Sequence, residues 1–296
     1  MRCKHCGHNN LWKRKNARDL TGLDQYQCPK CLKYESLEPR EPRTAKILLL
    51  DIETLPREVY EWSPKHGEFT PPHMTIKDWS ISCWASKWLF APEIMGEVVT
   101  PKEAIERKEG TILGGIWKLM DEADVIVTQN GLKFDIRKLN TKFIIYNYPP
   151  PSHYVNVDTL VAAKKFGFSY NSLNELAKEF GIGEKTEMKF DDWRACANGD
   201  KEALAHKLEY CKRDVAPLLE DVYLKLLPWM QHPNVGVYGN TEEDVCPKCE
   251  STNLRWDSKY STPEGLWKGW RCNSCGSIGR GKSKKKHLIK SVSIKS

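Results

Sequence analysis

The sequence lacks long hydrophobic segments. The longest unbroken apolar run beside any of its motifs covers residues 47–50, whereas a membrane-spanning helix needs ~18 such residues. The first residues contain no apolar stretch of the kind found in a secretory signal. Apolar residues make up 40% and charged residues 29% of the 296 positions, a balance that excludes a wholly disordered chain. We therefore expect a cytoplasmic protein with no membrane partner.

The sequence also lacks the even cysteine count of a disulfide framework. It has 11 cysteines, and most of them form Cys-x2-Cys pairs, which indicate zinc rather than disulfides in a reducing compartment. The pairs predict one structural Zn²⁺ near each end of the chain, with His5 and His8 as alternative ligands in the first site. The expected ligands are Cys3, Cys6, Cys28 and Cys31 in the first site, and Cys246, Cys249, Cys272 and Cys275 in the second.

The two cysteine-rich ends resemble each other. The gap between the pairs is 21 residues in the first and 22 in the second, and an Asn-Leu dipeptide follows each first pair at the same distance. We interpret them as two copies of one zinc ribbon. Linkers rich in proline, glycine and charge separate them from the centre. The predicted parts are an N-terminal ribbon (1–36), a central domain (45–231), a C-terminal ribbon (241–279) and a basic tail (280–296).

Acidic residues are scarce at both ends. Residues 1–34 have a net charge of +6 and residues 279–296 of +7, although the whole chain has only +7. Basic flanks around a slightly acidic centre indicate a polyanionic partner. Aromatic residues (Trp12 in the first ribbon; Trp256, Trp267 and Trp270 in the second) favour contact with nucleic acid. The alternative is a structural ribbon, or one that docks a replication or repair protein.

The central region alternates strand and helix patterns. Residues 46–52 form a largely apolar run typical of a buried central strand, and further strands are expected near 80–89, 96–100, 124–128 and 154–157. Helical spacing predicts helices over 111–121, 134–146, 160–166 and 173–180, and a long helix over 201–227. This order indicates an α/β domain whose mixed sheet is flanked by helices.

Two carboxylates end the predicted central strand. Asp51 and Glu53 are two residues apart, so they share one face of the strand. Their mutual repulsion at a buried position would be relieved by Mg²⁺ or Mn²⁺, which prefer oxygen ligands. Taken alone, the pair also fits an ordinary polar strand end.

Two further motifs follow in the chain. Asn130-Gly-Leu-Lys-Phe134-Asp135 begins a predicted helix, and Tyr210 and Asp214 share one face of the long helix. Taken alone, these acids also fit a favourable helix start and a surface charge.

Together, Asp-Ile-Glu-Thr, Asn-Gly-x-x-Phe-Asp and Tyr-x-x-x-Asp resemble the motifs of the DEDD superfamily of 3′–5′ exonucleases, in its tyrosine subtype. They are also similar to the proofreading domain of B-family DNA polymerases. The resemblance covers about 45–230 and implies a ribonuclease-H-like fold with two-metal phosphodiester hydrolysis.

The resemblance also implies roles for individual residues. Asp51 would bridge two Mg²⁺ or Mn²⁺ ions, Glu53 and Asp214 would hold the nucleophile-side ion, Asp135 would support the second, and Tyr210 would orient the attacking water. Substrate contacts are expected from Thr54, Leu55, Asn130 and Phe134, although Phe134 equally fits a core anchor. For Asp158 we favour a helix N-cap over a fifth ligand.

We therefore expect a stand-alone, divalent-metal-dependent 3′–5′ exonuclease. Its substrate would be single-stranded nucleic acid with a free 3′ end, with DNA favoured over RNA. The alternatives are a structure-selective endonuclease that uses the same site, or a non-catalytic adaptor that binds nucleic acid through its zinc ribbons.

Overall fold

The structure is a computed structural model of the chain. It describes residues 12–18, 24–27, 31, 34–36, 44–62, 70–239, 243–263 and 265–284. The chain divides into two compact units, one made of residues 1–43 with 238–242, and the other of residues 44–237 with 243–296. Within the described residues, no helix is both long and apolar enough to cross a bilayer.

The first unit contains a small antiparallel sheet. Its strands are β1 (Trp12–Arg18), β2 (Asp24–Gln27) and β3 (Tyr34–Ser36), in the order β1-β2-β3. Of the four predicted zinc ligands, Cys31 lies between β2 and β3, whereas Cys3, Cys6 and Cys28 fall outside the described residues. The first zinc site therefore stays a prediction.

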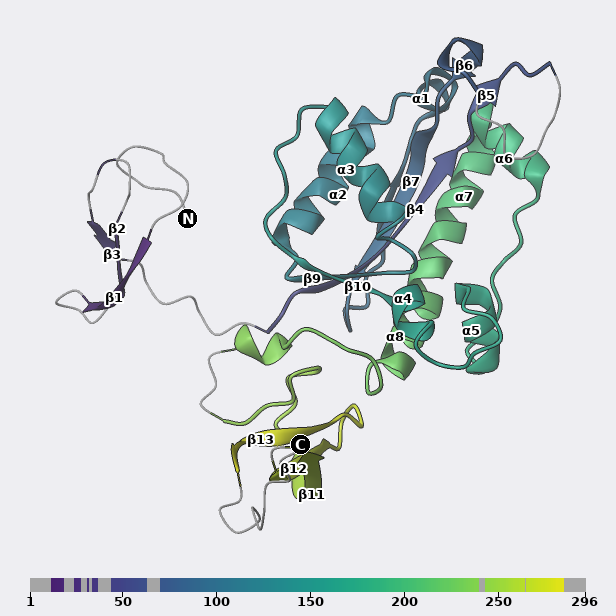
Figure 1. The fold of residues 1–296 in the computed structure, drawn as a ribbon. Helices are drawn as coiled ribbons and strands as arrows, with labels where there is room; N and C mark the ends of the chain where they lie inside the picture. The colour runs from purple at the N-terminus through teal and green to yellow at the C-terminus, as the bar shows by residue number, and fades with distance from the viewer. Residues whose placement is uncertain are drawn as a thin grey trace, which may run out of the picture. The chain divides into compact units, whose positions relative to one another are not determined.

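A five-stranded mixed sheet forms the centre of the second unit (Figure 1). Strand β9 pairs parallel with β4 and β10, whereas β7 pairs antiparallel with β4 and β8. This arrangement confirms the predicted α/β class with a mixed sheet. The strands, in the order β10-β9-β4-β7-β8, are β10 (Val155–Asp158), β9 (Val125–Thr128), β4 (Ile47–Leu55), β7 (Ser80–Trp88) and β8 (Met95–Val98).

Strand β4 is buried on both faces, which explains its continuous apolar run. Ile47 and Leu49 point into one hydrophobic cluster, and Leu48, Leu50 and Ile52 point into the other. Burying a side chain of this size stabilises the fold by roughly 1.5–3 kcal/mol. Because Asp51 and Glu53 alternate in step with Leu49, they belong to the first face.

Helices cover both faces of the sheet (Figure 1). The face with Ile47 and Leu49 packs against α4 (Thr159–Ala163), α5 (Leu173–Glu179) and α8 (Glu220–Leu226). The opposite face packs against α2 (Gly110–Glu122) and α3 (Asp135–Ile145). Shorter elements complete the domain: β5 (Glu58–Val59), η1 (Pro72–Met74), β6 (Thr75–Lys77), α1 (Pro101–Glu106), α6 (Phe190–Ala197) and η3 (Val235–Val237).

The long helix predicted over 201–227 is interrupted, so that prediction was wrong in its continuity. Helix α7 (Lys201–Arg213) passes into a π-helical segment, η2 (Asp214–Leu219), before α8 begins. Ala216 has an extended backbone (φ −146°, ψ 127°) immediately before Pro217. A residue that precedes proline is disfavoured in the helical region, and proline has no N–H to donate. Asp214 therefore lies at the junction between two helices.

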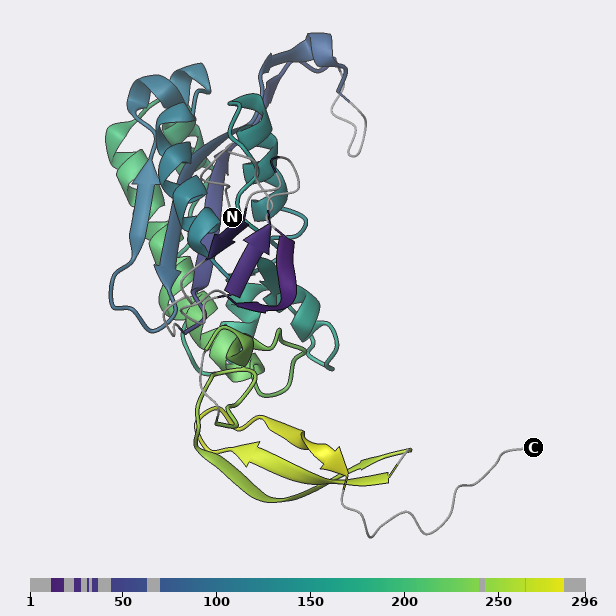
Figure 2. The ribbon, with the colours of Figure 1, turned by 90° about the vertical axis from the view of Figure 1, so that its left-hand side faces the viewer.

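The C-terminal ribbon belongs to the same unit as the central sheet. Its strands β11 (Leu254–Thr262), β12 (Gly265–Cys272) and β13 (Ile278–Lys284) form an antiparallel sheet (Figure 2). The Lys248 ammonium donates to the carbonyls of Leu227, Pro228 and Met230 at 2.8–2.9 Å. These carbonyls belong to the C-cap of α8 and the turn after it, so Lys248 satisfies polar groups just beyond the helix end.

Candidate functional site

Three carboxylates from distant parts of the chain meet at the end of β4. Asp51, Glu53 and Asp214 each offer an oxygen, and these oxygens lie within 4.8 Å of one another. The β4 alternation presents the first two, and the packing of α7 and η2 against β4 delivers Asp214. Oxygen ligands lie about 2.0–2.6 Å from Mg²⁺ or Ca²⁺, so one ion fits between such a set.

Asp135 lies outside this group of three but next to it. Its Oδ1 accepts a hydrogen bond of 3.0 Å from the backbone N–H of Ile52, the residue between Asp51 and Glu53. Asp135 is the first residue of α3 and is only 2% exposed. The structure thus brings three predicted ligands together and holds the fourth against the strand that carries two of them.

Burial shifts the acidity of all four carboxyl groups. It raises the pKa of Asp51 well above its ordinary value, and repulsion from Asp135, Glu53 and Asp214 adds to the effect. It raises the pKa of Glu53 to about 7, despite the opposing lysines 207 and 185, and that of Asp135 to about 7. It also raises the pKa of Asp214, against the pull of Lys185. A divalent cation would remove this repulsion, so the donor set fits such an ion.

Lys185 is a site residue that the sequence analysis missed. Its Nζ lies 2.5 Å from Asp214 Oδ2 and 4.9 Å from the centre of the Tyr210 ring. Burial alone would lower the pKa of Lys185, but Asp214 and a hydrogen bond with Tyr210 outweigh it and raise the pKa. Burial also raises the pKa of Tyr210, so its phenol keeps its proton near neutral pH. Lys185 lies between α5 and α6, where no periodic pattern could have indicated it.

Helix α7 brings two more side chains to the end of β4. The Cys211 thiol lies 3.4 Å from Asp51 Oδ2, and Lys207 donates to the Thr54 carbonyl at 2.8 Å. Burial lowers the pKa of Lys207. Because Lys207, Cys211 and Asp214 recur at helical spacing, their shared face was visible in the sequence. The sequence did not indicate that Lys207 is buried, because lysine is rarely buried without a partner.

The predicted substrate-contact residues lie close in the chain to the carboxylates: Thr54 and Leu55 follow Glu53 in β4, and Asn130 and Phe134 precede Asp135. Leu55 is fully buried, whereas Phe134 is half-buried and packs against the cluster that contains α3. The backbone N–H of Asn130 donates to Asp158 Oδ1 at 3.0 Å. Asp158 also accepts from the N–H of Leu160, which confirms it as the N-cap of α4. Contact between these residues and a substrate stays a prediction.

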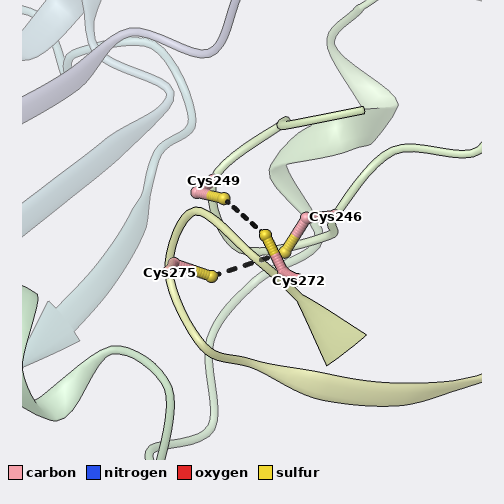
Figure 3. Close-up of side chains that lie close together, drawn as sticks. All are labelled: Cys246, Cys249, Cys272 and Cys275. Atoms are coloured by element: carbon pink, nitrogen blue, oxygen red, sulfur yellow. Dashed lines mark hydrogen bonds between the residues drawn. The ribbon is translucent and has the colours of Figure 1, made fainter. Parts of the chain in front are cut away.

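The second predicted zinc site is fully assembled (Figure 3). The Cys246 and Cys275 sulfurs lie 3.7 Å apart, and the Cys249 and Cys272 sulfurs 3.6 Å apart. Tetrahedral zinc with bonds of about 2.3 Å places its sulfurs about 3.8 Å apart, whereas a disulfide bond measures about 2.05 Å. The geometry therefore fits zinc.

A family model matches part of the central unit. Residues 96–225 match the model of the RNase_H superfamily, a stretch that includes Asp135, Tyr210 and Asp214 but begins after Asp51 and Glu53. A family B DNA polymerase from the hyperthermophilic archaeon Pyrobaculum calidifontis is 17% identical, with a TM-score of 0.46. That match covers 70% of this chain and 28% of the polymerase chain, so this chain corresponds to little more than a quarter of it. No curated protein matches the chain.

The raised pKa values predict a pH-dependent stability of the metal-free protein. Glu53 and Asp135 keep their protons up to about pH 7 when folded, whereas the unfolded chain releases them near 4. Unfolding therefore releases protons in this window, and stability falls as the pH rises through it. Between about pH 5 and about pH 8 in chelator, we expect the wild-type melting temperature to fall about 5 °C more than that of Asp51→Asn, because the variant lacks a buried carboxyl whose own pKa is raised. Mn²⁺ should reverse the wild-type loss. Parallel curves for the two proteins would contradict the raised pKa of Asp51.

The cysteine cluster predicts one zinc ion in the C-terminal ribbon. Cys246→Ser combined with Cys272→Ser should lower the zinc content, measured by elemental analysis, by one ion per chain. Ser274→Ala, at an exposed position in the same turn, is the control and should keep the wild-type content. An unchanged zinc content in the double variant would exclude this site.

Proposed function

We propose that this chain is a divalent-metal-dependent 3′–5′ exonuclease, because residues 96–225 match the model of the RNase_H superfamily and the sheet to which they belong carries a cluster of carboxylates. It would hydrolyse phosphodiester bonds of single-stranded nucleic acid from a free 3′ end. The observation that supports this most directly is the convergence of Asp51, Glu53 and Asp214 within 4.8 Å, with Asp135 bonded to the same strand. These are the residues that the DEDD motifs single out.

The four carboxylates fit two divalent ions such as Mg²⁺ or Mn²⁺. When bound, the ions supply the positive charge that activates a water and stabilises the leaving 3′ oxygen. Asp51 is repelled by all three other acids, so it would gain most from the positive charge and would help to hold the ions. Glu53 and Asp214 would hold the ion on the nucleophile side, and Asp135 would support the other.

Tyr210 and Lys185 would prepare the attacking water. The Tyr210 phenol can both donate and accept, and its raised pKa keeps it protonated. Lys185 bonds to Asp214 and to Tyr210, so it fixes the position of the phenol relative to the carboxylates. A fixed hydrogen-bonding group of this kind orients a water for in-line attack.

The substrate would be held by parts of the chain outside the carboxylates. The basic first ribbon and the basic tail would attract phosphates through salt-sensitive contacts. In the second ribbon, Trp267 and Trp270 are each only 7% exposed, so these two rings support the ribbon rather than stack on bases. Trp256 is half-buried, so of the three tryptophans it is the one that could still stack on a base. The preference for DNA rests on the resemblance of the motifs to proofreading domains.

A 5′-labelled single strand tests the reaction. With Mg²⁺, the wild-type protein should produce a descending ladder of products, on DNA more rapidly than on a matched RNA strand. Asp51→Ala and Asp214→Ala should abolish it, because each removes an ion ligand, and Tyr210→Phe should slow it by about 10²-fold. Glu202→Ala, an exposed acid on α7, should leave the rate unchanged. A protein that gives no ladder with any divalent ion would instead be a binding adaptor.

A circular single strand tests the requirement for an end. An exonuclease cannot begin on a strand without a terminus, so the circle should stay intact while its linear form is degraded. A linear strand with a blocked 3′ end should also resist, and one with a blocked 5′ end should not. Cleavage of the circle by the wild-type protein but not by Asp214→Ala would identify an endonuclease at the same site.

A further inference from the structure

Lys207 is a buried cation to which the chemistry above gives no role. Its side chain is 0% exposed and is among the largest fully buried side chains of the described residues. Its Nζ donates to the Thr54 carbonyl at 2.8 Å and lies 3.8 Å from the centre of the Trp193 ring. Burying an ammonium is costly, and the opposite charge that acts on Lys207 most strongly is the carboxylate of Glu53, at the end of β4.

The carbonyl that Lys207 binds belongs to a β-bulge. The register pairs Glu53 with Cys83 but Thr54 with Ile81, so Ser82 is an extra residue in β7. A bulge bends the strand and re-aims the side chains around it. The Ser82 hydroxyl donates to the Glu53 carbonyl at 3.0 Å. Two buried side chains thus hold two successive carbonyls at the point where β4 presents Glu53.

Lys207 also connects this bulge to the helix that carries the rest of the site. Lys207, Tyr210 and Asp214 are three and then four residues apart, so they lie on one face of the helix. The hydrogen bond to Thr54 therefore joins that face to the end of β4. This link fixes how far Asp214 and Tyr210 lie from Glu53.

We propose that Lys207 is a positioning residue for the nuclease site. It holds the bulge at Glu53 and Thr54 against α7, and so aligns Glu53 and the Thr54 backbone with Tyr210 and Asp214. The proposal deepens the exonuclease function and rests on it. Lys207 is not one of the carboxylates that would hold the ions, and it acts through its hydrogen bond to the β4 backbone.

Two substitutions each remove one of the two side-chain hydrogen bonds to the bulge. Lys207→Met removes the donor and the charge but keeps an apolar stem, and Ser82→Ala removes the hydroxyl with little change in volume. At saturating Mg²⁺ and oligonucleotide, each should lower kcat about tenfold or more, because a misplacement of about 1 Å costs as much as 10²-fold. The double variant should lose little more than Lys207→Met alone, because both changes act on one bulge.

Two further variants separate positioning from folding. Lys207→Arg keeps a donor and a charge and should recover part of the kcat lost in Lys207→Met. Lys201→Met, the same substitution at an exposed position of α7, should behave as wild type. Lys207→Met should keep a melting temperature well above that of the assay. A wild-type kcat in Lys207→Met, or losses that multiply in the double variant, would overturn the proposal.

Amide hydrogen exchange measures how well the bulge is ordered, and it does not depend on nuclease activity. The amides of residues 53–55 should exchange at least tenfold faster in Lys207→Met than in wild type, while those of β9 stay unchanged. Unchanged exchange at 53–55 would overturn the positioning role whether or not the chain is a nuclease. A wild-type protein without metal-dependent activity would instead contradict the proposed function.

Discussion

The site depends on like charges that the fold forces together in a buried place. Asp51, Glu53, Asp135 and Asp214 come from β4, α3 and the end of α7, and their burial raises every one of their pKa values. A protein stores such repulsion only where packing overdetermines the geometry. Here β4 is buried on both faces, so its acids cannot move apart without disrupting a hydrophobic cluster. A divalent cation bound between them would relieve the repulsion without moving them.

Local pattern identified the elements and the acids, but not the contacts that organise them. The apolar run at residues 47–50 predicted the central strand, and motif spacing predicted Asp51, Glu53, Asp135 and Asp214. Periodicity describes one element at a time, so it could not show that Lys185, from an irregular segment, reaches Asp214. It also treats a lysine as exposed, so Lys207 was missed. Pro217 indicates an interruption of the long helix, but the amphipathic pattern continues on both sides of it, so one continuous helix was predicted.

The C-terminal ribbon supports the central domain through polar contacts as well as packing. Lys248 holds three carbonyls at the end of α8, and Glu250 accepts from the backbone N–H of Ala45, just before β4 begins. Cys275 packs against the same hydrophobic cluster as the face of β4 that carries the acids. A module of this size buries too little apolar surface to be stable alone, so its contacts with the central sheet also stabilise it. The order of the ribbon and that of the start of β4 are therefore physically linked.

Helix α7 combines three roles on one face. Lys207 binds the β4 backbone, Cys211 contacts Asp51, and Asp214 completes the carboxylate group. If the helix continued unbroken, Asp214 would lie within a regular turn, and its position would follow every shift of the residues after it. The η2 interruption separates it from α8, and α8 packs with the ribbon side of the unit. The break therefore lets α7 align with β4 independently of the contacts that α8 makes. This explains why an irregular segment lies beside the carboxylate group, whose side chains must be placed accurately.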